Sequence, residues 1–389
     1  MYKIQTLNAI SDIIHTQLSR EQFSIVKDEP VPDGILVRSA DMLHMELPAS
    51  LLAVARAGAG VNNIPISACS KKGIVVFNTP GANANAVAEL VMAGLLLASR
   101  NIAGGIAWAQ SLKGAGDEVP AQVEKGKAAF VGPELRGKTL GVIGLGAVGA
   151  IAANSAANGF GMEVIGYDPF ISVENAWSLS RAIKRAASVD EVLLKSDYVS
   201  IHVPLNDKTR SMFDTETLGR MKQGAHLMNF SRAELVDSAA MLAALKSGAI
   251  ASYVVDFPTD EMLGIKNVVC IPHLGASTPE SEDNCAQMAA AELRDYLLYG
   301  SIRNAVNLPD VQLSAPESAR ILVLHENIPN MVSAISAAVS AEGINIDNMV
   351  NKSKKEIAIT VMDIQTPPSE TLLHTIEALP GIIRVRAFA

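Results

Sequence analysis

The sequence predicts an α/β protein with two doubly wound parallel-sheet domains followed by a small βαββαβ domain. Its 389 residues are enough for two or three domains. Hydrophobic residues make up 49% of the chain but aromatic residues only 4%, so Ala, Val, Leu and Ile must form the core, as in parallel sheets covered by Ala-rich helices. Short β-branched runs alternate with stretches of helical period, which is the pattern of βαβ units.

A first α/β series occupies the N-terminal quarter of the chain. Strands are expected at 35–38, 52–55 and 74–77, and a helix at about 85–99, where apolar residues recur at helical spacing. Residues 112–135 are richer in Gly, Lys, Glu and Pro, and we expect them to be a connector.

A second series starts at Lys138. Strands are expected at 139–143, 163–167, 198–202, 226–229, 252–256 and 268–271, followed by a helix at about 279–299. Six strands with crossovers predict a doubly wound dinucleotide-binding sheet, the Rossmann fold. Residues 307–318 read as a linker, and the remaining segment predicts strand, helix, strand, strand, helix, strand, which is the order of a ferredoxin-like domain.

Charge and cysteine content exclude several classes of protein. The net charge of −8 disfavours general binding to nucleic acid or to an anionic membrane. Three cysteines without C-x-x-C spacing predict neither a disulfide framework nor a metal site, and favour the reducing cytoplasm. The N-terminus lacks the apolar core of a signal peptide, and the most apolar run, Leu140 to Ala153, is short and interrupted by glycines.

A glycine loop carries the cofactor signal. The strand at 139–143 runs into Gly144, Gly146 and Gly149, spaced G-x-G-x-x-G, and then into an Ala-rich helix whose N-terminus favours a pyrophosphate. Asp168 ends the next strand, 19 residues after Gly149, where the ribose hydroxyls of NAD need an acceptor. A carboxylate there repels the 2′-phosphate of NADP, so the sequence predicts NAD.

Polar segments follow the last three strands of the second series. Arg232 lies after one strand, the acids of 256–261 after the next, and His273 after the last. All three should meet at the carboxyl edge of the sheet, where open α/β folds bind ligands. An Arg can bind a carboxylate through two hydrogen bonds, and a His with an acid beside it can exchange a hydroxyl proton. Together these residues predict hydride transfer on a 2-keto or 2-hydroxy acid.

Four motifs, at 54–63, 78–83, 144–149 and 272–278, resemble the D-2-hydroxyacid dehydrogenase family over nearly the whole chain, and most closely its phosphoglycerate branch. The resemblance implies NAD-dependent oxidation of D-3-phosphoglycerate to 3-phosphohydroxypyruvate, the first step of L-serine biosynthesis. It also implies a substrate-binding domain at 1–99 and 283–306, an NAD-binding domain at 100–282 and a regulatory domain at 319–389.

The same resemblance implies the site residues. Arg232 and His273 would be catalytic. Their acid partner would be Glu261, which keeps the family spacing of five from Asp256, although an alternative alignment gives that place to Asp260. Asp256 would then contact the nicotinamide carboxamide. Further cofactor-binding positions would be Ala147, Val148, His202, Val203, Pro204, Ser231, Gly275 and Ala276, and substrate-binding positions Arg38, Arg56, Ala59, Gly60 and Asn83. Arg38 and Arg56 also have a simpler interpretation as structural salt bridges.

The C-terminal segment resembles an ACT domain, a module that binds amino acids, often between two subunits. His325, Asn327 and Asn345 match the pattern with which regulated family members recognise serine, which predicts L-serine as an effector. Asn330 replaces the usual Gly after Pro329. The alternative is an ACT fold that only dimerises.

Two other functions fit the same motifs. One is a hydroxypyruvate or glyoxylate reductase of the same family, whose substrates lack phosphate. The other is an NAD-sensing regulator that binds proteins without turnover. The resemblance implies a homodimer or a homotetramer, and the sequence does not choose between them.

Overall fold

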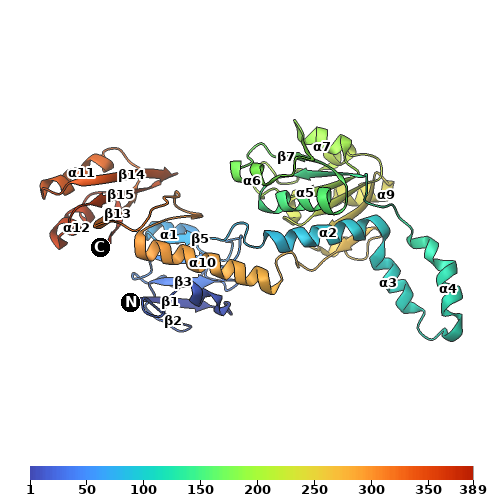
Figure 1. The fold of residues 1–389 in the computed structure, drawn as a ribbon, viewed down its shortest axis with the longest axis horizontal. Helices are drawn as coiled ribbons and strands as arrows, with labels where there is room; N and C mark the ends of the chain where they lie inside the picture. Colours follow the sequence, from blue (N-terminus) through green and yellow to red (C-terminus); the bar gives the residue numbers. More distant parts are fainter. Residues whose placement is uncertain (389) are drawn as a thin grey trace. The chain divides into compact units, whose positions relative to one another are not determined.

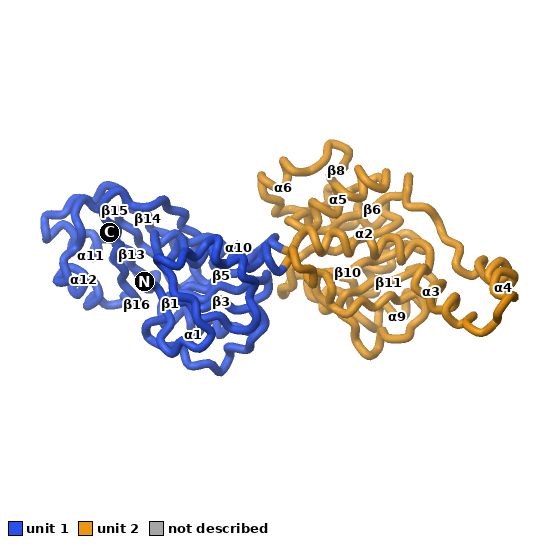
Figure 2. The backbone as a smooth tube through the Cα atoms, turned by 60° about the horizontal axis from the view of Figure 1, so that its bottom comes forward, with its two compact units in different colours: residues 1–82, 282–389 blue, residues 83–281 orange. Residues whose placement is uncertain are grey.

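The computed structural model describes residues 1–388, which form two compact units. Unit 1 contains residues 1–82 and the chain from 282 onward, and unit 2 contains residues 83–281 (Figure 2).

Unit 1 begins with a parallel five-stranded sheet of order β2-β1-β3-β4-β5. The last three strands were predicted, whereas the first two were not. β1 offers little hydrophobic pattern, because Ile4 is its one fully buried side chain and Lys3, Gln5 and Thr6 surround it. The elements are β1 (Tyr2–Leu7), η1 (Asp12–Thr16), β2 (Phe23–Val26), β3 (Gly34–Val37), β4 (Ala53–Arg56), α1 (Ile66–Lys71) and β5 (Val75–Phe77), with α10 (Pro279–Tyr299) packed on the sheet.

The C-terminal part of unit 1 is the predicted βαββαβ domain, with an antiparallel sheet of order β14-β15-β13-β16 (Figure 1). Side chains on one face, such as Ile321 and Val323, pack with those of the two helices. On the other face Leu322 and Leu324 join the core of the first sheet. The elements are β13 (Ala319–Glu326), α11 (Met331–Ala341), β14 (Ile346–Lys354), β15 (Ile357–Ile364), α12 (Glu370–Glu377) and β16 (Ile382–Phe388).

Two arginines fasten this domain to the end of α10. Arg320 is buried and donates from Nε to Asp363 Oδ1 at 2.6 Å, and from Nη1 to the carbonyls of Tyr299 at 2.7 Å and Ser314 at 2.8 Å. Arg386 donates to the carbonyl of Leu297 at 2.9 Å. Because the last carbonyls of a helix have no partner within the helix, these cations satisfy them. Residues 319–388 therefore share one compact unit with the first sheet, where the sequence predicted separate domains.

Unit 2 contains a parallel seven-stranded sheet of order β12-β11-β10-β9-β6-β7-β8. The order of β6 to β11 is that of the doubly wound dinucleotide-binding sheet, and β12 adds a seventh strand at one edge. All six predicted strands are present: β6 (Thr139–Ile143), β7 (Glu163–Tyr167), β9 (Tyr198–Ile201), β10 (Ala225–Asn229), β11 (Ile250–Val255) and β12 (Val268–Cys270). The helices are α2 (Ala84–Arg100), α5 (Ala147–Gly159), α6 (Val173–Ser178), α7 (Val189–Lys195), α8 (Thr215–Gly219) and α9 (Ser238–Ser247), with short turns η4 (Ala233–Leu235) and η5 (Asp260–Met262).

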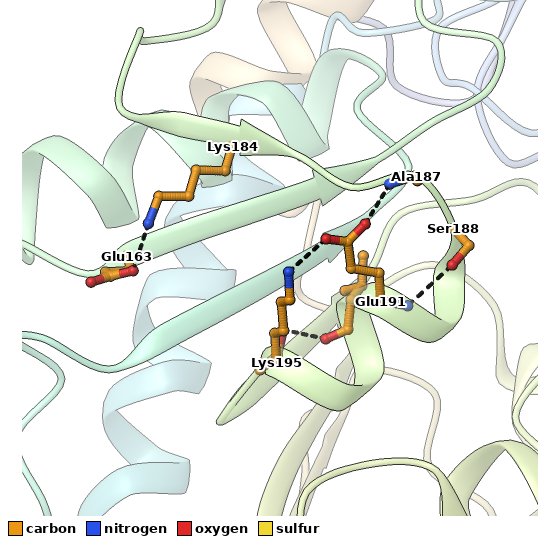
Figure 3. Close-up of polar contacts among 8 residues, drawn as sticks. Glu163, Lys184, Ala187, Ser188, Glu191 and Lys195 are labelled. Atoms are coloured by element: carbon orange, nitrogen blue, oxygen red, sulfur yellow. Dashed lines mark hydrogen bonds and ion pairs between the residues drawn. The ribbon is translucent and has the colours of Figure 1, made fainter.

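The unpredicted edge strand, β8 (Ile183–Arg185), pairs in parallel with β7, and polar contacts lie on it and after it (Figure 3). Lys184 forms an ion pair with Glu163 of β7 at 2.9 Å. After the strand, Glu191 accepts the amide of Ala187 at 2.7 Å and pairs with Lys195 at 2.6 Å. A three-residue edge strand carrying two cations lacks the hydrophobic pattern from which sequence reasoning detects strands.

Helix α2 belongs to unit 2, because Val87, Val91 and Leu95 pack in its core with Leu140 and Val254. The boundary between the units therefore falls at 82/83, whereas the sequence predicted 99/100. In the sequence, α2 follows β5 and therefore looks like the next helix of the first α/β series. Its packing on the second sheet is visible only in the tertiary contacts.

The expected connector at 112–135 is largely helical, and so is the segment directly before it. α3 (Ile102–Ser111), η2 (Gly116–Glu118), α4 (Val119–Gly126) and η3 (Lys127–Phe130) form an arm that projects from unit 2 (Figure 1). Trp108 packs on Phe130 at 5.3 Å between ring centroids, and Gly126 leaves room for the indole. Within residues 1–388 no single helix is long and apolar enough to cross a membrane, and α2 with α3 meets that test only as a pair bent by 67°.

Candidate active site

The predicted cofactor and catalytic residues of unit 2 follow the carboxyl ends of its parallel strands. The glycine loop follows β6, Asp168 follows β7, His202 follows β9, Arg232 follows β10, and the His273 segment follows β12. β6 and β9 are neighbours from which the chain winds in opposite directions, so the loop after β6 lies at the topological switch point.

The glycine loop has the geometry of a phosphate cradle. Gly144 has φ +91, and a Cβ there would lie 2.5 Å from the carbonyl oxygen of His202. A Cβ on Gly149 would overlap the carbonyl of Gly144. Gly146 differs, because nothing lies within 4 Å of its Cβ position and no side chain caps the helix α5 that follows it. Open space before uncapped N–H groups fits a pyrophosphate, so the residues present fit NAD.

Asp168 is fixed beside this loop. Its Oδ2 accepts the amide of Leu145 at 2.9 Å and its Oδ1 that of Phe170 at 2.8 Å. The two bonds hold the carboxylate at the carboxyl end of β7, where the resemblance places the ribose acceptor.

His202 is suited to an uncharged role. Its Nε2 lies 2.9 Å from Ser200 Oγ, and burial lowers its pKa to about 4. The imidazole is therefore neutral near pH 7 and adds no charge beside an adenine. Val203 and Pro204 continue this loop, and Ser231 donates to the carbonyl of Ile201 at 2.8 Å, joining it to the segment after β10.

Arg232 and His273 both approach one aromatic ring, that of Phe257. The guanidinium carbon of Arg232 is 5.9 Å from the centroid of Phe257, and the His273 ring is 4.7 Å from it, tilted by 49°. Both polar side chains are exposed, so a substrate can reach them. His273 has φ +52, a left-handed conformation that is uncommon for residues other than Gly. Sequence reasoning missed Phe257, although the residue stands directly after Asp256.

Neither predicted acid is joined to the histidine. Asp260 and Glu261 are exposed in η5, and among residues 1–388 no hydrogen bond links either carboxylate to His273. The choice between them stays a prediction.

Asp256 has a different surrounding from the expected one at the nicotinamide. It is 1% exposed, and its carboxylate oxygens accept the amides of Leu274 at 2.8 Å and Gly275 at 2.9 Å. Burial raises its pKa, while these amides and the nearby His273 oppose the rise. Asp256 therefore holds the segment that carries His273 and Ala276.

The substrate-binding candidates of unit 1 gather at the ends of β3 and β4. Arg38 forms an ion pair with Glu282 at 2.6 Å, and Arg56 donates from Nε to the carbonyl of Arg38 at 3.0 Å. The structure thus gives Arg38 the salt bridge that was the simpler interpretation. Asn83, the remaining candidate, precedes α2 in unit 2, and no side-chain hydrogen bond caps that helix.

The loop at Ala57–Gly60 is fastened by residues that the sequence analysis quoted without a role. Gly58 N donates to Thr79 Oγ1 at 2.8 Å, and Asn78 Nδ2 donates to the carbonyl of Ala59 at 2.6 Å. Ala59 is exposed and Gly60 half-buried, which leaves this backbone open to a ligand. The motif Asn78-Thr79-Pro80-Gly81 was the available signal, since a turn after β5 can reach the neighbouring β4.

One chain does not bring the three predicted regulatory residues together. His325 is buried, with Nε2 at 2.9 Å from Thr360 Oγ1 and Nδ1 at 2.8 Å from the carbonyl of Glu326. Ladder pairing places His325 level with Ser353, eight residues after Asn345. At about 3.3 Å per residue, Asn345 lies more than roughly 20 Å from His325, at the opposite end of the sheet. The exposed Asn327 donates to the carbonyl of Lys355 at 3.1 Å. Asn330 has φ +70, a left-handed conformation that Asn adopts more readily than most residues other than Gly.

Comparisons with known proteins agree with this site. Residues 93–275 match the model for the NAD-binding domain of D-isomer specific 2-hydroxyacid dehydrogenases. The chain is 32% identical to D-3-phosphoglycerate dehydrogenase from Haemophilus influenzae, over 90% of the chain and 83% of that protein. It is 33% identical to the Escherichia coli enzyme of the same name, over 84% and 79%.

A solved structure gives the same result. The NAD+-bound 3-phosphoglycerate dehydrogenase of Entamoeba histolytica is 26% identical, with a TM-score of 0.60 over 79% of this chain and 98% of that one. The chain therefore is an NAD-dependent dehydrogenase and contains the glycine cradle, Asp168, Arg232 and His273. It belongs to the D-isomer specific 2-hydroxyacid dehydrogenase family.

Proposed function

We propose that this dehydrogenase oxidises D-3-phosphoglycerate to 3-phosphohydroxypyruvate in the cytoplasm, as the first step of L-serine synthesis. The observation that carries the proposal is the pairing of Arg232 and His273 on one sheet edge with the open cradle at Gly146. The substrate follows from the relatives, which are named D-3-phosphoglycerate dehydrogenase at 32–34% identity.

The residues would divide the chemistry as follows. Arg232 binds the substrate carboxylate through a charge-assisted fork. His273 takes the proton of the C2 hydroxyl as the hydride leaves C2, and returns it in the reverse reaction. Bound NAD supplies the hydride acceptor. Arg38 and Arg56 attract the phosphate, and the backbone amides of the Ala57–Gly60 loop contribute donors.

Initial-rate oxidation of NADH with 3-phosphohydroxypyruvate, hydroxypyruvate and 2-ketoglutarate tests the substrate. We expect a strong preference for the phosphorylated keto acid, and a loss of about 100-fold or more in kcat for His273→Asn with NADH affinity unchanged. Equal rates with hydroxypyruvate, together with insensitivity to Arg38→Ala and Arg56→Ala, would favour the unphosphorylated reductase. Binding of NADH without turnover on any keto acid would favour the regulator.

Regulation by L-serine is a separate part of the proposal. The βαββαβ topology supports an ACT domain. Because His325 and Asn345 lie at opposite ends of one sheet, a serine that contacts both needs the domains of two chains. Inhibition by millimolar L-serine that Asn345→Ala removes would support this arrangement. Unchanged activity under L-serine would leave the domain a structural role.

The helical arm supports a homo-oligomer. None of the α3 side chains is buried within the chain, and Ile106 is 58% exposed. The apolar side chains that α3 leaves exposed, such as Ile106, mark an interaction surface. We infer that a second copy covers α3, in a homodimer or a homotetramer.

A further inference from the structure

His273 needs more than its own backbone to hold its conformation. Its φ of +52 is left-handed, which costs a residue with a Cβ on the order of 1 kcal/mol. The backbone around it supplies one bond, from His273 N to the carbonyl of Ile271 at 3.0 Å. Its side chain is exposed, so neighbouring core residues do not fix the ring. Contacts from another segment must therefore define where the imidazole points.

That segment is the pair of residues that directly follows β11. β11 and β12 pair in parallel as far as Val255 and Cys270, and Ile271 N donates to the carbonyl of Val255 at 2.8 Å. The two strands therefore leave the sheet side by side, and Asp256 with Phe257 runs next to the segment from Ile271 to Gly275.

Each of the two residues contacts a different part of the histidine segment. Asp256 binds the backbone, through the amides of Leu274 at 2.8 Å and Gly275 at 2.9 Å. Phe257 contacts the side chain, with its ring 4.7 Å from the imidazole. Edge or offset contacts at this separation are favourable for aromatic pairs.

The same ring also faces the substrate-binding arginine. The guanidinium of Arg232 lies within cation–π distance of Phe257, and Nη1 of Arg232 is tied to the carbonyl of Ser231 at 2.6 Å. One ring thus contacts both the group that would bind the carboxylate and the group that would move the proton.

We propose that Asp256 and Phe257 are the positioning residues of the site: the Asp256 carboxylate sets the backbone of the His273 segment, and the Phe257 ring, which Arg232 also approaches, sets the orientation of the imidazole. The assignment rests on the proposed roles of His273 and Arg232. Neither positioning residue exchanges a proton or binds substrate. The charged groups to be considered with His273 are Asp256, which interacts with it electrostatically, Arg232, which approaches the same Phe257 ring, and Asp260 with Glu261, which lie in η5.

The first test needs no activity. In the histidine Cε1–H NMR spectrum of the whole protein without cofactor, His273, assigned by His273→Asn, should show a ring-current shift. Phe257→Leu should abolish the shift and Phe257→Tyr should keep it. A wild-type His273 signal at the position of an exposed histidine would overturn the proposal. This readout stands even if the wild type reduces none of the keto acids, in which case the proposed function alone fails.

The second test is kinetic. Phe257→Leu should lower kcat about 10- to 100-fold, with NADH affinity within twofold and a displaced pH profile of kcat, because a mobile imidazole spends less time in the productive geometry. Phe257→Tyr should restore most of the rate. Phe160→Leu removes a half-buried ring at the far end of α5 and should leave kcat and the pH profile unchanged.

Asp256→Asn keeps the size of the side chain but removes the charge and one acceptor oxygen. It should lower kcat by a similar factor at unchanged NADH affinity, and it provides an independent answer if Phe257→Leu does not fold. Wild-type kcat and an unchanged pH profile in Phe257→Leu or in Asp256→Asn would overturn the assignment.

Discussion

Gly146 is the glycine of the loop whose Cβ position is not occupied by other atoms of the protein. The chain's own carbonyls crowd the Cβ positions of Gly144 and Gly149, whereas nothing lies within 4 Å at Gly146. Gly146→Val should therefore leave the fold intact and fill the cradle. We expect NADH affinity to fall at least about 10-fold, measured by fluorescence titration, with the melting temperature within about 2 °C.

Gly159, at the other end of α5, provides the matched control. Its Cβ position is also open, and it is exposed at the opposite end of that helix. Gly159→Val should bind NADH normally. Equal losses of affinity in both variants would mean that the helix, rather than the cradle, is disturbed.

His226 should make stability depend on pH. Burial lowers its pKa to about 4, and it lies stacked on Tyr198 and 2.7 Å from Ser252 Oγ. Between pH 6.5 and 4 the unfolded chain binds a proton that the folded chain excludes, so this stability is complete above 6.5 and is lost as pH falls towards 4. The loss of stability reaches about 3 kcal/mol only at pH 4 and below.

Urea unfolding at pH 7.5 and pH 5 measures this term. His226→Gln should lose less stability than the wild type on acidification. His15→Gln, which changes an exposed histidine, should retain the wild-type difference. The prediction is wrong if His226→Gln and the wild type respond equally to acid.

At the scale of elements, the sheet of the C-terminal domain depends on one buried charge. Arg320 is 2% exposed, and Asp363 of the neighbouring strand is its carboxylate partner. Asp363→Ala would leave a buried cation without its counter-charge, which costs about 3–5 kcal/mol. We expect a lower free energy of unfolding and faster proteolysis within residues 319–388.

Two further variants separate the charge from the packing. Asp347→Ala removes an exposed carboxylate of β14 and should be nearly neutral. Arg320→Met combined with Asp363→Ala should recover part of the loss, since no unpaired charge remains. A double variant less stable than Asp363→Ala would show that the hydrogen bonds of Arg320 to Tyr299 and Ser314 matter more than its charge.

The elements that sequence reasoning found and missed differ in hydrophobic pattern. β6, β9 and β11 are continuous apolar runs, and buried parallel strands are detected from such runs. β1, β2 and β8 are edge or near-edge strands with polar residues, and α4 lies in the segment at 112–135 whose Gly, Lys, Glu and Pro content predicted a connector. A strand at the edge of a sheet needs fewer apolar residues, so its own sequence carries less signal.

At the scale of the whole molecule, the arm should control assembly. Ile106→Glu places a charge on the exposed apolar side of α3, and we expect a smaller species in analytical ultracentrifugation with little change in the unfolding of the unit itself. Val131→Glu, at the end of the arm, is a second probe because its side chain is 80% exposed. Unchanged mass for both variants would exclude the arm as the interface.

The sequence by itself determined the fold class and the NAD cofactor, and it predicted Asp168, Arg232 and His273 as site residues. It could do so because a glycine loop, a strand-end acid and polar residues after consecutive strands are local signals, and parallel strands bring their carboxyl ends together. Only the tertiary structure decided that α2 packs in unit 2 and that Arg38 pairs with Glu282. It also separated His325 from Asn345, and it placed Asp256 and Phe257 in contact with the His273 segment. These facts depend on contacts between segments distant in sequence, and packing decides such contacts where periodicity and spacing leave several partners open.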